Sequence, residues 1–128
     1  MRTTRNRLAL FSAIALLAAC APAKGRSSNL APAPDVYVMV SNQNWLDVDV
    51  FAVRGASRIR IGQVTGSGSA RLKIPGNAIV GGQVQLMADP IGSSERYVTE
   101  VITVAPDQRV ELTVASAMRM SSYSVIRR

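Results

Sequence analysis

The sequence predicts an all-β domain, an antiparallel β-sandwich of roughly seven strands, from three observations. From residue 36 onward, apolar side chains recur at every second position, the period that places them on one face of a strand. Turns rich in Gly, Pro, Asn and Asp separate these runs at spacings of about ten residues. No segment after residue 36 shows the period of a long amphipathic helix. Two packed antiparallel sheets would bury one face of every run.

Two alternating runs open the predicted domain. Residues 36–40 and 46–53 each carry an apolar side chain at every second position. Gly55 follows in a turn, and residues 58–61 return with isoleucines on one face and arginines on the other. The second run and this return segment are therefore predicted to form a hairpin.

The hairpin has a predicted register. On its inner face Val50 lies opposite Ile61. On its outer face Arg60 lies opposite Phe51 and diagonal to Asp49, which predicts a cation–π contact and an ion pair.

Later segments complete the predicted sheets and continue the alternation. They are residues 70–74, 84–88, 97–104 and 109–114. Turn residues at 65–68, 75–77, 89–90 and 106–107 separate them. The tail, residues 117–128, could add an edge strand through 122–126 or could fray, and the pattern leaves both open.

The alternation is similar to that of immunoglobulin-like and transthyretin-like domains over most of residues 36–116. This resemblance implies a sandwich and assigns no functional residue, since such folds serve many functions.

A different pattern precedes the predicted domain. Three arginines within the first seven residues are followed by an apolar run over residues 8–17, shorter than the roughly 20 residues of a spanning helix. The run closes on Leu17, Ala18, Ala19 and Cys20, which resemble the lipobox of bacterial lipoproteins. The resemblance implies that Leu17, Ala18 and Ala19 are recognised by a processing enzyme and that a diacylglyceryl group is attached to the Cys20 sulfur. An ordinary buried helix that ends in cysteine is the alternative.

The same resemblance implies a location and a domain organisation. Ala21 stands where, in the enterobacterial sorting rule, Asp would mean inner-membrane retention, which favours the outer membrane facing the periplasm. We expect a signal peptide at residues 1–19, a lipidated, disordered tether at 20–35, rich in Pro, Ala and Ser, the sandwich at 36–116 and the tail at 117–128.

Composition excludes several classes of function. The chain has no histidine and one cysteine, so Ser-His-Asp, Cys-His and ordinary zinc sites cannot be assembled. Loss of Arg2, Arg5 and Arg7 with the leader would leave 12 basic against 8 acidic residues, a surplus too dispersed for nucleic-acid binding. We expect no catalytic residue, no metal and no cofactor besides the covalent lipid on Cys20. The expected partners are membrane lipid, through Cys20, and an envelope protein or glycan; the oligomeric state is left open.

Trp45 and its neighbours form the candidate binding site. This single tryptophan lies beside the amides of Asn42 and Asn44, a combination that could stack and hydrogen-bond a sugar of peptidoglycan or lipopolysaccharide. A tryptophan that plugs the core is the favoured interpretation of this residue.

Acidic residues offer a weaker candidate. Asp47 and Asp49 point to the same face of a strand, which could begin a calcium site or a hydrolytic carboxylate pair, with Glu95 or Glu100 as further candidates. A solvated face paired with arginines is the favoured interpretation. The sequence thus predicts a non-enzymatic envelope lipoprotein that interacts with proteins through strand edges or loops, with glycan binding as the second hypothesis.

Overall fold

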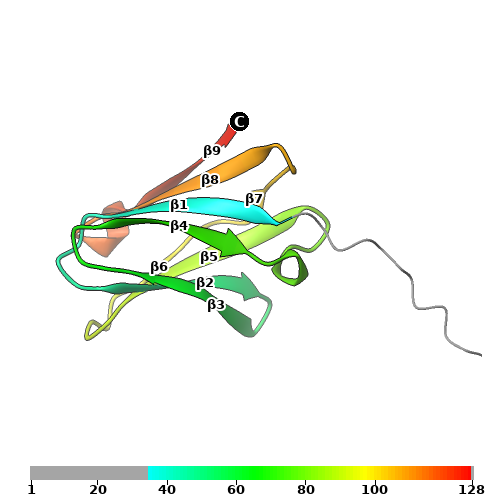
Figure 1. Cartoon of the computed structure of the whole chain (residues 1–128). Helices are drawn as coiled ribbons and strands as arrows, with labels where there is room; N and C mark the ends of the chain where they lie inside the picture. Colours follow the sequence, from blue (N-terminus) through cyan, green and yellow to red (C-terminus); the bar gives the residue numbers. More distant parts are fainter. Residues whose placement is uncertain (1–34, 128) are drawn as a thin grey trace, which may run out of the picture.

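A computed structural model describes residues 35–127 of the chain (Figure 1). The predicted signal peptide, the lipobox residues Leu17, Ala18, Ala19 and Cys20, and nearly all of the predicted tether lie outside the described residues.

The described chain forms two packed sheets, which confirms the all-β sandwich (Figure 1). The four-stranded sheet has the order β4-β1-β8-β9 and the five-stranded sheet the order β3-β2-β5-β6, with β7 also paired to β5. The strands are β1 (Val36–Asn42), β2 (Val48–Arg54), β3 (Ser57–Val64), β4 (Ser69–Ile74), β5 (Gln83–Pro90), β6 (Tyr97–Val98), β7 (Ile102–Thr103), β8 (Gln108–Val114) and β9 (Ser122–Arg127). Two short 3₁₀ turns accompany them, η1 (Gly76–Ala78) and η2 (Met118–Met120). Residues 35–127 contain no helix long and apolar enough to cross a membrane.

The core consists of the inward positions of the alternating strands. β-Branched side chains dominate it because they pack well on a pleated surface. The core residues of β1, β2, β5 and β8 are Val36, Val38, Val40, Val48, Val50, Ala52, Val84, Leu86, Ala88, Val110, Leu112 and Val114. The alternation in the sequence predicts the inward face of each of these strands.

One pairing differs from an antiparallel sandwich. β1 pairs antiparallel with β4 but parallel with β8, with Tyr37 opposite Arg109. A parallel pair needs a long connection, and here the chain between the two strands builds the whole five-stranded sheet. Local alternation carries no information about such a distant pairing.

The β2–β3 hairpin contains a bulge that shifts its predicted register. Phe51 lies opposite Arg60 as predicted, but Val50 lies opposite Gly62 and not Ile61. The irregularity falls between Val50 and Phe51, where one strand carries an extra residue.

The segment predicted as one strand over residues 97–104 is broken into β6 and β7 at Thr99. The Thr99 N–H donates to the Leu86 carbonyl at 2.9 Å, and its hydroxyl accepts from the Leu86 N–H at 3.0 Å. The same hydroxyl donates to the Glu100 carbonyl at 2.7 Å. The side chain thus replaces a backbone partner, as threonine does when it competes with a regular ladder.

The tail belongs to the sandwich. β9 pairs antiparallel with β8 over residues 122–127, and the buried Ser121 accepts a hydrogen bond from the Ala115 N–H at 3.0 Å through its hydroxyl. Tyr123 packs on the core. The domain therefore extends past the predicted boundary at residue 116, and of the two expectations for the tail, pairing within its own sheet is confirmed.

Deletion of residues 121–128 should destabilise the protein, because it removes the β9 ladder and the packing of Tyr123. A loss of about 2 kcal/mol would lower the Tm of a domain this small by roughly 10 °C, measured by circular dichroism. Removal of residues 127–128 alone is the control and should change the Tm little. An unchanged Tm after the longer deletion would contradict the pairing.

Candidate functional site

The chain crosses between the two sheets at the end of the sandwich opposite the start of β1 (Figure 1). Residues 42–47, which we call the crossover corner, connect β1 of the four-stranded sheet to β2 of the five-stranded sheet. The turn after β3, the turn after β5 and η2 lie at the same end.

Asn42 ties this corner to the turn after β3. The side chain is 2% exposed, and its amide nitrogen donates to the carbonyls of Leu46 at 2.8 Å, Thr65 at 3.0 Å and Val64 at 3.3 Å. Its amide oxygen accepts from the Asn44 N–H at 3.0 Å. One side chain therefore satisfies backbone groups of both the crossover corner and the segment at the end of β3, which are not paired with each other as strands.

Asn44 ties the same corner to the segment after β8. Its side chain is also buried; the amide oxygen accepts from the Leu46 N–H at 3.0 Å, and the amide nitrogen donates to the Ser116 carbonyl at 3.3 Å. Its backbone carbonyl accepts from the Ser67 N–H at 2.8 Å. We call Asn42 and Asn44 together the asparagine clamp.

The clamp corrects one expectation about the site. Asn42 and Asn44 are buried, and their amide groups bond to the protein itself, so they are not available to a sugar. Asparagine in a turn often bonds to nearby backbone in this way, and that is the role seen here.

Trp45 projects from the corner into solvent. The residue is 79% exposed, so the expectation of a core plug is wrong. Its backbone is held closely: a Cβ on Gly66 would lie 2.2 Å from the Trp45 carbonyl oxygen, so only glycine fits there. The Gly66 N–H donates to Asp47 Oδ1 at 2.9 Å. An exposed indole thus stands on a firmly held backbone.

Two more large apolar side chains are exposed at this end. Ile91 follows β5 and is 49% exposed, and its N–H donates to the Asp47 carbonyl at 2.9 Å. Met120 ends η2 and is 69% exposed. Trp45, Ile91 and Met120 form what we call the distal crest.

The acidic residues act as structural partners. Asp49 Oδ1 lies 2.6 Å from Arg60 Nη2, which confirms the predicted ion pair; this hydrogen bond raises the pKa of Arg60. Asp47 bonds to Gly66 and, at 3.4 Å, to the side-chain amide of Gln63. Within residues 35–127 no three His, Cys, Asp or Glu residues gather as a metal site would need, so Glu95 and Glu100 join no such cluster.

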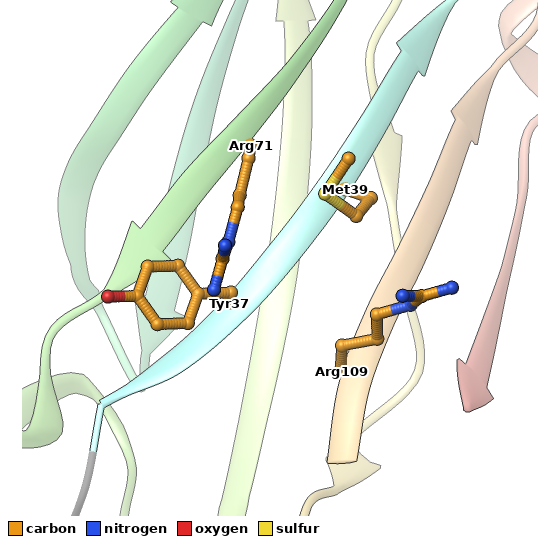
Figure 2. A pocket seen from close by; sticks show the side chains of 4 residues that line it. All are labelled: Tyr37, Met39, Arg71 and Arg109. Carbon is orange, nitrogen blue, oxygen red and sulfur yellow. The ribbon is translucent and has the colours of Figure 1, made fainter. Parts of the chain in front are cut away.

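A hollow lies on the outer face of the four-stranded sheet. Tyr37 and Met39 point outward from β1 because Val36, Val38 and Val40 point inward. With Arg71 of β4 and Arg109 of β8, they line a hollow of about 380 Å³, which we call the outer groove (Figure 2). Arg71 lies opposite Met39 and Arg109 opposite Tyr37 in the sheet register.

The outer groove carries more positive than negative charge. The Arg71 guanidinium carbon lies 3.9 Å from the centroid of the Tyr37 ring (Figure 2). Arg109 is paired with Glu111 at 3.0 Å. Next to the groove on β4, Lys73 pairs with Asp35, and this hydrogen bond raises the pKa of Lys73.

The outer groove could not be predicted from the sequence. Its residues come from three strands, and they meet only through the antiparallel β1–β4 and parallel β1–β8 pairings. The sole local signal is that Tyr37 and Met39 occupy the outward positions of an alternating strand.

Comparison with known proteins gives no identification. No family model matches this chain, and no curated protein matches it either. The site therefore has to be interpreted from its own geometry.

Replacement of Asn42 by Ala should destabilise the domain by about 2–4 kcal/mol, because three buried or partly buried carbonyls and one N–H lose their partner. Urea unfolding followed by circular dichroism measures this. Gln43→Ala is the matched control, since the Gln43 side chain is exposed, and should change stability by less than about 0.5 kcal/mol. Equal stability of the two variants would contradict the role of the clamp.

Proposed function

We propose that this protein is a membrane-anchored lipoprotein of the bacterial cell envelope, and that its sandwich is a non-enzymatic recognition module. The resemblance of Leu17, Ala18, Ala19 and Cys20 to a lipobox supports the anchor. The composition of the following residues supports a tether. On this proposal, Cys20 carries the lipid and the protein faces the periplasm from the outer membrane.

The observation that carries recognition is the 79% exposure of Trp45 on a clamped corner. Tryptophan is among the residues that most often dominate binding energy at interfaces. A large apolar side chain contributes most to the free energy of binding when its backbone is already ordered, because little conformational entropy is then lost on binding. The asparagine clamp provides that order.

The direction of the distal crest also suits an anchored module. β1 contains seven residues, a length of about 23 Å, and the crest lies at the end of the sandwich away from its first residue. A tether joined before Val36 would leave Trp45, Ile91 and Met120 facing away from the bilayer. The occupant we propose is another protein of the envelope, because two of these three side chains are aliphatic or thioether groups suited to an apolar protein surface.

Glycan binding remains a second candidate because the Trp45 indole is open for stacking. The amides of Asn42 and Asn44 are used within the protein, so hydrogen bonds to a sugar would have to come from exposed neighbours such as Gln43. This requirement makes peptidoglycan or lipopolysaccharide the less favoured partner.

Replacement of Cys20 by Ala should move the protein from the membrane fraction to the soluble fraction and abolish labelling with palmitate. An anchor with several acyl chains holds far more firmly than one chain, so the shift should be nearly complete. Ser28→Ala, in the same predicted tether, is the control and should change neither readout. A soluble, unlabelled parent protein would refute the anchor.

Replacement of Trp45 by Ala should reduce recovery of the envelope partner by at least about tenfold, the effect of removing an interface hot spot. Crosslinking in intact cells followed by affinity purification measures this. Thermal stability should change little, because the side chain is mostly exposed. Val80→Ala removes an exposed apolar side chain from the turn between β4 and β5 and is the matched control.

Fluorescence of the single tryptophan separates the two candidate partners. A change in emission on addition of peptidoglycan fragments or lipopolysaccharide would favour the glycan. Unchanged emission, together with loss of a crosslinked protein in Trp45→Ala, would favour the protein. Equal recovery of all partners by the Trp45 and Val80 variants would refute recognition through the crest.

A further inference from the structure

The outer groove lies away from the distal crest and has no role in the function proposed above. It is lined by Tyr37 and Met39 of β1, flanked by Arg71 on one neighbouring strand and Arg109 on the other (Figure 2). Arg71 lies opposite Met39 and Arg109 opposite Tyr37, so the two positions are two strand spacings and two residues apart, about 12 Å in all. Both long side chains can reach a group that sits above β1.

Arg71 has the geometry of an anion ligand. Its guanidinium carbon lies 3.9 Å from the centroid of the Tyr37 ring, a cation–π contact that uses no N–H donor of the guanidinium. Among residues 35–127, no carboxylate lies within salt-bridge distance of Arg71. A planar guanidinium with unpaired edge donors matches two oxygens of a phosphate group.

Arg109 provides a second cation that can be recruited. Its partner Glu111 forms an exposed pair, and such pairs are weak because solvent screens them. Figure 2 shows Arg109 extended from β8, with Met39 between it and Arg71. With Lys73 and its partner Asp35 included, this face carries three cations and two carboxylates. A phosphate would therefore meet a positive surface.

We propose that the outer groove binds the phosphate group of an anionic phospholipid, with Arg71 as the main ligand, Arg109 as the second, and Met39 against the glycerol carbons. The groove begins at Tyr37, close to Asp35, the first described residue, and so lies toward the end where the proposed tether joins the domain. The inference rests on the proposed function in one respect, because the proposed anchor is what brings the groove near a bilayer. A free organic phosphate has the same chemistry and is an outcome of the test.

The test uses the chain from residue 20 with Cys20→Ser, so that binding does not depend on acylation. This chain contains every residue of the described core. Sedimentation with phosphatidylglycerol–phosphatidylcholine vesicles should show binding that phosphatidylcholine vesicles lack. Arg71→Gln should weaken it at least about tenfold, the effect of losing a charge-assisted hydrogen bond. Arg58→Gln, an exposed arginine of the other sheet, should weaken it no more than about fivefold.

A second pair of variants separates a site from a diffuse charge effect. Arg71→Lys keeps the charge but loses the planar fork and the ring contact, so it should still weaken binding several-fold. Arg58→Lys should bind as the parent does. Circular dichroism should show the parent's Tm in all four variants, since these side chains are exposed.

Three results with vesicles would overturn the proposal. They are equal binding to both vesicle types, equal losses in Arg71→Gln and Arg58→Gln, and parent-like binding by Arg71→Lys. A titration with glycerol phosphate, followed by NMR, tests whether the bound phosphate belongs to a lipid. An affinity for glycerol phosphate equal to that for the vesicles would contradict a lipid ligand. Because the assay omits the acyl chain and leaves Trp45 intact, its failure is distinguishable from failure of the anchor or of the distal crest.

Discussion

The sandwich depends on the hydrogen bonds of the asparagine clamp. Where the chain passes from β1 to β2, the sheet ladders end, and backbone groups of the corner, of the turn after β3 and of the segment after β8 need other partners. Asn42 and Asn44 supply them from inside the protein. The two sheets are thereby fixed to each other at one end without a disulfide, which suits a domain whose described residues include no cysteine.

The same bonds connect stability with the recognition that we propose. Fixing the backbone on both sides of Trp45 removes freedom that a binding partner would otherwise have to remove, and Gly66 allows the close contact that completes the support. The distal crest and the outer groove, the two surfaces to which we assign binding, lie at different places along the length of the domain. The apolar loops lie at one end, and the arginine-lined groove lies on a sheet face toward the other.

The features that could be predicted from the sequence are those that depend on residues close together in the chain. The period of two in the sequence predicted the inward faces of β1, β2, β5 and β8, and the Asp49–Arg60 pair followed from the hairpin. The break at Thr99 could not be predicted, because it depends on Leu86 lying beside it in space. Nor could the burial of Asn42 be predicted, because asparagine is usually exposed. Prediction of the outer groove would have required knowledge of which strands, distant in the sequence, pair with β1.

The parallel pairing of β1 with β8 has a consequence for the order of assembly. β1 lies between β4 and β8 in its sheet, so its second edge stays open until residues 108–114 have been made. Closure of so long a loop is slow, because its entropy is lost before the contacts form. A chain with this topology therefore cannot complete its four-stranded sheet before residues 122–127 of β9 have been made, close to the last of the described residues.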